Sequence, residues 1–289
     1  MVYDIVMIGH VSKDIMIYKD SVQKFLGGPV IYSSIAATTN NKNIKVITVA
    51  NKEAESDLMV MSDNGVDVTR LDSEKTTSIE NIYFSADKEK RKVTLLSRAT
   101  NFSIDNMIDF DAKIVHLAGL FKDEIPDSFI EFYSKKAEVA IDAQGLLRAS
   151  TNNDLLFKNW DNLDEYSKYI TYLKTDAAEA EILTGEKDRK KAAKILGDKG
   201  IREVMVTHNT EVLIYSDGKF YTAPFNPNNL SGRTGRGDTT FAAYLSKRLD
   251  SSIQDSVNYA AALCSIKMET PGPFKGTYND VIERIKTFN

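Results

Sequence analysis

The chain has 289 residues, of which 42% are hydrophobic and 27% are charged, as is usual for a globular protein. Its net charge of −4 and the lack of a basic run argue against nucleic acid or an anionic membrane as a partner. The single cysteine, Cys264, excludes an internal disulfide, and Met1–Gly9 does not resemble a signal peptide. We therefore expect a cytoplasmic protein.

Short apolar runs and helical periodicities alternate along the first seventy residues. Apolar runs that end in turn residues indicate buried strands, and apolar residues spaced by three and four indicate helices. Gly27-Gly28-Pro29 breaks the chain before a helix, because proline suits a first helical turn. In chain order we predict strands at 3–9, 44–50 and 66–71, and helices at 30–39 and 55–64.

Residues 76–99 differ from this alternation. Ser78–Phe84 and Arg91–Ser97 are β-rich pieces on either side of a charged turn, Asp87–Lys90. This pattern predicts an antiparallel hairpin with a solvated tip. Ile15–Tyr18 predicts another exposed strand. An antiparallel hairpin inside an alternating chain indicates a small sheet appended to the main one.

The alternation resumes after residue 112 and continues to the end of the chain. We predict strands at 113–117, 138–142, 169–174 and 203–207, a hairpin at 211–224, and helices at 127–136, 177–183, 190–196, 252–269 and 278–286. This order predicts a doubly wound α/β fold, with a mainly parallel sheet covered by helices on both faces. Ligands of such sheets bind at the carboxyl ends of the strands, where we expect Asp14, Asp142 and the loop 232–237.

The glycine-rich stretch at residues 232–245 carries the clearest chemical signal. Its glycines let backbone N–H groups approach a ligand, and the helix predicted beside them adds unpaired donors and a positive dipole end. These features predict an anion site, most naturally for phosphate. Asp238 would repel a resting phosphate, so we interpret it as a base that takes a proton from an attacking hydroxyl. The alternative is a glycine-rich turn in which Asp238 caps the helix.

Three motifs occur in a fixed order along the chain. The first is the opening strand followed by Asp14 and then Gly27-Gly28; the second runs from Asp176-Ala-Ala-Glu179 to Gly185; the third is Thr234-Gly-Arg-Gly-Asp-Thr239. In this order they resemble the ribokinase-like, or PfkB-type, family of carbohydrate kinases over nearly the whole length. The resemblance implies a single α/β domain, residues 1–289, with a small β-sheet lid from about residues 11–24 and 76–99.

The resemblance also implies roles for individual residues, with Mg²⁺ and ATP as cofactor and co-substrate. Asp238 would be the catalytic base, and the backbone amides of Gly235, Arg236 and Gly237 would form the anion hole for the transferred phosphoryl group. Glu179 with Asp176 would organise Mg²⁺ through waters. The other implied contacts are Asp14, Gly27, Gly28, Gln144 and Arg148 for the acceptor, and Thr207, Thr234, Gly235 and Gly237 for the nucleotide, with Tyr259–Ile266 as the adenine wall.

The chain departs from the family pattern at several positions. The Asp-Thr pair that usually precedes the catalytic glycines is missing, and Arg236 replaces an alanine inside the anion hole. Asp176 replaces the usual asparagine. Tyr32 stands where an asparagine is often found, which argues against ribokinase itself. Gln144 and Arg148 either reach the substrate or belong to a turn that a surface arginine stabilises.

We predict a kinase that transfers the γ-phosphoryl group of MgATP to a hydroxyl of a sugar or polyol. A nucleoside or inositol kinase of the same family is the alternative within this class. A sugar-binding regulator without transfer activity is the alternative outside it, although the presence of both Glu179 and Asp238 favours an enzyme. We therefore expect a small-molecule partner and no binding to nucleic acid or membrane. The exposed β-face at 79–97 would suit a homodimer.

Overall fold

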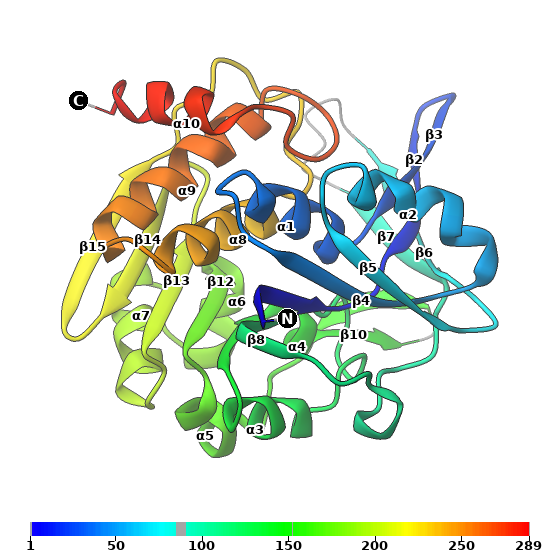
Figure 1. Ribbon diagram of the computed structural model, residues 1–289, viewed down its shortest axis with the longest axis horizontal. Coiled ribbons are helices and arrows are strands. Elements are labelled where there is room, and N and C mark those ends of the chain that lie inside the picture. The colour runs from blue at the N-terminus through cyan, green and yellow to red at the C-terminus, as the bar shows by residue number, and fades with distance from the viewer. Residues whose placement is uncertain (1, 85–90, 152, 289) are drawn as a thin grey trace.

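A nine-stranded sheet forms the centre of the computed structural model, which describes residues 2–84, 91–151 and 153–288 (Figure 1). Its strand order is β15-β14-β13-β12-β9-β8-β1-β4-β5, and all neighbours from β13 to β5 are parallel. The strands are β1 (Val2–Ile8), β4 (Ile44–Ala50), β5 (Asp67–Asp72), β8 (Asp111–Leu117), β9 (Glu138–Asp142), β12 (Tyr172–Asp176), β13 (Glu203–Thr207), β14 (Glu211–Ser216) and β15 (Lys219–Pro224).

Helices cover both faces of this sheet, as the doubly wound prediction requires (Figure 1). One apolar core lies against α1 (Pro29–Thr38), α2 (Glu55–Ser62), α8 (Arg236–Arg248), α9 (Ile253–Lys267) and α10 (Tyr278–Ile285). The other lies against α3 (Ser128–Ser134), α4 (Gln144–Leu147), α5 (Leu163–Tyr166), α6 (Ala177–Thr184) and α7 (Arg189–Asp198). The α/β fold class is confirmed.

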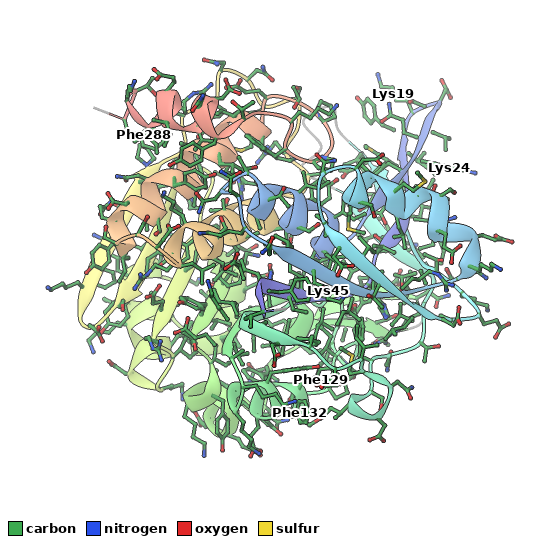
Figure 2. All side chains as sticks on the ribbon, in the orientation of Figure 1. Lys19, Lys24, Lys45, Phe129, Phe132 and Phe288 are labelled. Atoms are coloured by element: carbon green, nitrogen blue, oxygen red, sulfur yellow. The ribbon has the colours of Figure 1, made fainter. Side chains whose placement is uncertain are left out.

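A second sheet of six strands stands beside the first, in the order β10-β11-β7-β6-β2-β3. Its strands are β2 (Ser12–Tyr18), β3 (Ser21–Gly27), β6 (Thr77–Tyr83), β7 (Arg91–Ser97), β10 (Arg148–Thr151) and β11 (Asp154–Phe157). The β2–β3 hairpin projects from the body, with Lys19 at its turn and Lys24 on β3 (Figure 2). The predicted hairpin at 78–97 is present as β6 and β7, while the charged turn at 87–90 lies outside the described residues.

Three strands of this second sheet were not predicted. The first four residues of β3 are exposed and lack a clean alternation of apolar and polar side chains. Strands β10 and β11 have four residues each, too few for a periodic pattern, and β11 joins the sheet through β7, which is distant in sequence. Assigning this sheet as a lid inserted in one domain stays a prediction.

Two sequence positions also differ from expectation. Asp14 does not lie at the end of the first strand but inside β2, because the chain crosses from one sheet to the other at residues 9–11. The strand predicted at 169–174 begins at Tyr172, since residues 167–169 form a single helical turn. No helix in the described residues is long and apolar enough to cross a membrane.

Candidate active site

Two glycines shape the loop before α8. At each of them, other side chains fill the space where a Cβ atom would lie. Gly235 caps α8 with φ 78°, and a Cβ there would lie 2.2 Å from Cδ1 of Tyr32. A Cβ on Gly237 would lie 3.0 Å from Nζ of Lys174. The left-handed φ and the close tyrosine ring both require glycine at 235. The ring and the lysine therefore approach the backbone of this loop directly.

Backbone N–H groups at this helix start remain available for an anion. The amides of Gly235 and Gly237 donate to no acceptor in the described part of the chain, whereas the Arg236 amide donates to Arg233 O at 3.2 Å. An unpaired amide at a helix N-terminus, with the helix dipole behind it, favours a negative charge. The structure thus offers the 235 and 237 amides of the predicted anion hole, and uses the 236 amide to close a turn.

Asp238 follows these amides on the first turn of α8. Burial, together with the neighbouring carboxylate of Asp142, raises the pKa of Asp238 to about 6. The cations Lys174, Arg148 and Lys267 oppose this rise. A carboxylate with a pKa near 6 is ionised at neutral pH and is a better proton acceptor than an ordinary aspartate. This placement suits the role of general base.

A buried lysine that the sequence analysis did not select lies at the centre of the site. Lys174, on β12, contacts Asp142 with its Nζ 3.0 Å from Oδ2, and Glu179 with its Nζ 3.7 Å from Oε2. All three side chains are at most 7% exposed. Burial disfavours the ammonium, but Asp142 and Glu179 outweigh it and hold the pKa of Lys174 above its ordinary value. The ammonium therefore stays charged beside Gly237.

Asp176 and Glu179 form a reciprocal cap at the start of α6. Oδ1 of Asp176 accepts from the Glu179 amide, and Oε2 of Glu179 accepts from the Asp176 amide, both at 2.8 Å. Among the described residues, no three His, Cys, Asp or Glu side chains are grouped to hold a metal ion. The two carboxylates of this cap are the groups that could face the waters of a hydrated Mg²⁺.

Three of the five predicted acceptor residues, namely Asp14, Gly27 and Gly28, lie close together where the second sheet leads into α1. A Cβ on Gly27 would lie 2.5 Å from Oδ2 of Asp14, so the carboxylate rests on the bare glycine backbone. Gly28, at φ 101°, starts α1, and a Cβ there would lie 2.5 Å from His10 O. Burial, together with the charges of Asp238 and Asp14, raises the pKa of Tyr32. Tyr32 thus lies between the acceptor side and the catalytic loop.

Gln144 and Arg148 are joined to each other. Nη2 of Arg148 donates to the side-chain Oε1 of Gln144 at 2.6 Å. The backbone N–H of Gln144 donates to Oδ1 of Asp142 at 3.0 Å. The Arg148 guanidinium also lies 5.9 Å from the ring of Phe157. Residues 144–147 form the short helix α4, and the half-buried Arg148 opposes the rise in the pKa of Asp238.

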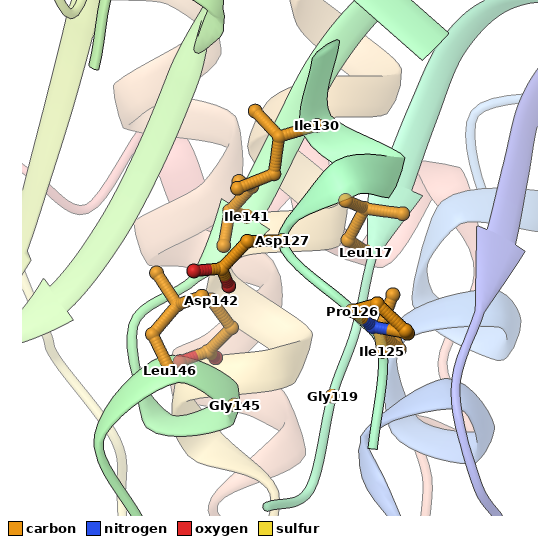
Figure 3. Close-up of a pocket in the computed structure, with 10 residues that line it drawn as sticks. All are labelled: Leu117, Gly119, Ile125, Pro126, Asp127, Ile130, Ile141, Asp142, Gly145 and Leu146. Carbon is orange, nitrogen blue, oxygen red and sulfur yellow. The ribbon is translucent and has the colours of Figure 1, made fainter. Parts of the chain in front are cut away.

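A small cavity lies beneath this turn and is lined mainly by apolar side chains (Figure 3). Its volume of about 20 Å³ holds roughly one water molecule. A Cβ on Gly145 would lie 2.8 Å from the Gly119 backbone, so these two loops touch without side chains between them. The cavity is therefore too small for a substrate.

Arg236 extends from the anion hole toward the turn after β13. Its Nη1 donates to Oδ1 of Asn209 at 2.9 Å, and no carboxylate of the described residues lies within ion-pair distance. Burial and the charge of Arg233 lower the pKa of this half-buried guanidinium. A partly desolvated cation without an acidic partner favours an anionic ligand.

The surfaces expected to hold a nucleoside are covered. Thr207 is 2% exposed, and its hydroxyl donates to Thr175 O at 3.3 Å. Residues 259–265 of α9 are fully buried. The segment 226–232 is fastened onto the end of this helix by hydrogen bonds from the Asn226 amide to Ser265 Oγ and from the Asn228 amide to Glu269 Oε1, both 2.8 Å long. Most of the predicted adenine wall is therefore part of the apolar core, and the segment 226–232 contacts it at Ser265.

Sequence reasoning missed Lys174, Tyr32 as a contact of Gly235, Asn209 and the buried Lys267. Lys174 ends the strand predicted at 169–174, and this position was a signal that could have identified it, because a buried strand rarely carries an unpaired charge. The other three become visible only when distant segments meet.

Comparison with known proteins identifies the family of the chain. The model of the pfkB family of carbohydrate kinases matches residues 1–277. A solved pyrophosphate-dependent kinase of the ribokinase family, complexed with a pyrophosphate analogue and myo-inositol, is 35% identical, with a TM-score of 0.87 over 96% of this chain and 99% of that one.

More distant similarities are found in sequence and in structure. The cytidine kinase of Thermococcus kodakarensis is 23% identical over 84% of this chain and 87% of its own. Arabidopsis thaliana ribokinase, solved with ribose and ATP, is 18% identical, with a TM-score of 0.77 over 99% of both chains, and so shares the fold. Taken with the match that spans almost the whole sequence, these findings show that the chain belongs to the pfkB family of carbohydrate kinases.

Proposed function

We propose that this protein transfers a phosphoryl group from pyrophosphate to a hydroxyl of a neutral cyclic polyol. Asp238 takes the hydroxyl proton while the acceptor oxygen forms a bond to phosphorus. The bridging P–O bond breaks, and orthophosphate leaves. The amides of Gly235 and Gly237 stabilise the charge on the transferred group, since phosphoryl transfer depends mainly on positioning and on charge stabilisation.

The observation that carries this proposal is the first turn of α8. It places a carboxyl with a pKa raised to about 6 directly after amides that have no acceptor among the described residues. A phosphoryl group held by these amides would lie beside the base that activates its acceptor. A helix cap alone would not account for the buried cation Lys174, whose Nζ lies 3.0 Å from where a Cβ of residue 237 would be.

The acceptor side favours an uncharged substrate with several hydroxyls. Asp14 and Gln144 supply carboxylate and amide groups that can accept and donate hydrogen bonds to hydroxyls. The relative that was solved with myo-inositol supports an inositol-like ring. A sugar or a nucleoside remains the alternative acceptor.

MgATP is the donor implied by the family resemblance, and two observations favour pyrophosphate instead. Residues 259–265 of the predicted adenine wall are buried in the protein's own core, and Arg236 spans from the predicted anion hole to Asn209. Its guanidinium could bind the leaving phosphate, because arginine recognises phosphate through paired N–H groups. The 35% identical pyrophosphate-dependent relative supports this choice.

Magnesium would reach the site with the donor's phosphates. Asp176 and Glu179 would hold it through its waters, since both carboxylates already cap α6. When bound, the ion would neutralise part of the phosphate charge.

The test combines two donors, magnesium pyrophosphate and MgATP, with a panel of inositols, sugars and nucleosides, and detects products by ³¹P NMR. We expect transfer from pyrophosphate to one polyol, and a loss of about 10³-fold in Asp238→Asn with pyrophosphate binding retained. Asp217→Asn, in an exposed turn, is the matched control.

Each other outcome contradicts a separate part of the proposal. Transfer from ATP but not from pyrophosphate would support a kinase and contradict pyrophosphate as its donor. Near-normal turnover in Asp238→Asn would contradict the assignment of Asp238 as the general base. Ligand binding without transfer from either donor would favour the sugar-binding regulator.

A further inference from the structure

A second buried lysine lies directly under the catalytic loop and has no part in the proposed chemistry. Lys267, at the end of α9, is 1% exposed. Its ammonium donates to Gly232 O at 2.5 Å and to Thr234 O. No carboxylate in the described ranges forms an ion pair with it. A buried ammonium is costly unless its hydrogen bonds serve the surrounding structure.

These two carbonyls determine which way the loop amides face. In a planar trans peptide the C=O and the following N–H point in opposite directions. Because Thr234 O is turned toward Lys267 beneath the loop, the Gly235 N–H is turned away from it. Gly235 is one of the two residues whose amides have no acceptor within the described chain.

Tyr32 holds the same assembly from the side of α1. The Lys267 ammonium lies 5.2 Å from the centre of the Tyr32 ring, within cation–π range. The ring in turn occupies the space beside Gly235. The loop is therefore fixed between a cation below and an aromatic ring alongside, each supplied by a different helix.

We propose that Lys267 is a positioning residue that holds residues 232–235 so that the Gly235 amide faces the donor's phosphoryl group. This inference rests on the proposed function, because it assumes that the loop binds a phosphoanhydride. Lys267 itself contacts backbone carbonyls and not the substrate.

The charge of Lys267 responds to the groups that face it. These are Asp238 on α8, Cys264 on α9 and Tyr32 on α1. Burial lowers the pKa of Lys267 to about 8, against the opposing effect of Cys264 and Asp238. The ammonium is therefore present below pH 8 and lost above it, which weakens the hold on both carbonyls and predicts an alkaline decline in donor binding.

The test compares Lys267→Met with wild type by pyrophosphate calorimetry and steady-state kinetics. We expect the dissociation constant for pyrophosphate to rise about tenfold and kcat to fall about 100-fold, with acceptor binding unchanged. The alkaline decline near pH 8 should disappear in the variant. Lys247→Met is the matched control, since its ammonium also lies near a tyrosine ring, 5.7 Å from Tyr259, but away from the loop.

A measurement on the wild-type protein covers the case in which Lys267→Met fails to fold. The backbone amide resonance of Gly235 should titrate with a midpoint near pH 8, because the preceding carbonyl loses its charged donor. A resonance that stays constant from pH 6.5 to 9.5 would overturn the inference, as would a folded variant with wild-type pyrophosphate affinity and kcat. Absence of transfer by the wild type would instead refute the proposed function.

Discussion

Replacing Gly235 by alanine should damage the protein in two separable ways. The residue has φ 78°, and an added Cβ would lie 2.2–2.7 Å from three atoms of the Tyr32 ring. The left-handed backbone costs an alanine about 1–2 kcal/mol. Forcing the buried ring aside adds about 1–3 kcal/mol. We therefore expect Gly235→Ala to lower the free energy of unfolding by about 2–5 kcal/mol.

A matched glycine separates the backbone term from the steric one. Gly65 has φ 80°, and a Cβ there would meet nothing within 4 Å. Gly65→Ala should therefore lower the free energy of unfolding by the backbone cost of about 1–2 kcal/mol alone. The difference between the two variants measures the contact between Tyr32 and the loop.

Urea unfolding followed by circular dichroism gives both free energies, and initial rates give the functional effect. Because the Gly235 amide would move with the displaced backbone, we expect kcat/KM to fall at least about 100-fold in Gly235→Ala and to stay near wild type in Gly65→Ala. If both variants lost the same free energy of unfolding, the packing of Tyr32 against Gly235 would not be as described.

Two further predictions concern the charges of the site. Burial raises the pKa of Asp238 to about 6, so its carboxyl is protonated below that pH and cannot accept a proton; kcat should fall about tenfold per pH unit below 6, in a profile measured from pH 4.5 to 7.5. Replacing Lys174 by methionine leaves the carboxylates of Asp142 and Glu179 buried without their cation, so the free energy of unfolding should fall by about 3–5 kcal/mol at pH 7.5. A fall below 1 kcal/mol in urea titrations would contradict this account of the cluster.

The main fold could be predicted because its signals are local. Runs such as Ile44–Ala50 are apolar at five of their seven positions, and the structure buries all seven residues. Strands β3, β10 and β11 were missed because their pairing, and not their own composition, makes them strands. A four-residue polar segment such as Arg148–Thr151 contains too little periodicity to reveal a neighbour.

The same distinction applies to the site. The Gly235–Asp238 motif and the Asp176–Glu179 cap lie within single stretches of sequence, where spacing predicts geometry. Lys174 reaches Gly237 from a strand more than sixty positions earlier, and Arg236 reaches Asn209 across a turn. Contacts of this kind depend on how strands and helices are placed in three dimensions, which a single sequence does not specify.

Departures from the family pattern that look unrelated in the sequence become one structural unit in the fold. Tyr32, in place of the common asparagine, packs against Gly235 and lies over the Lys267 ammonium. Lys267 in turn binds the carbonyls of Gly232 and Thr234, in the stretch where the usual Asp-Thr pair is missing. Without the lysine the two carbonyls would lose their shared donor, and without the tyrosine the ammonium would lose the aromatic ring 5.2 Å from it. We therefore expect restoration of asparagine at position 32 alone to impair the loop, and its effect on pyrophosphate binding to be smaller in a Lys267→Met background than in the wild type.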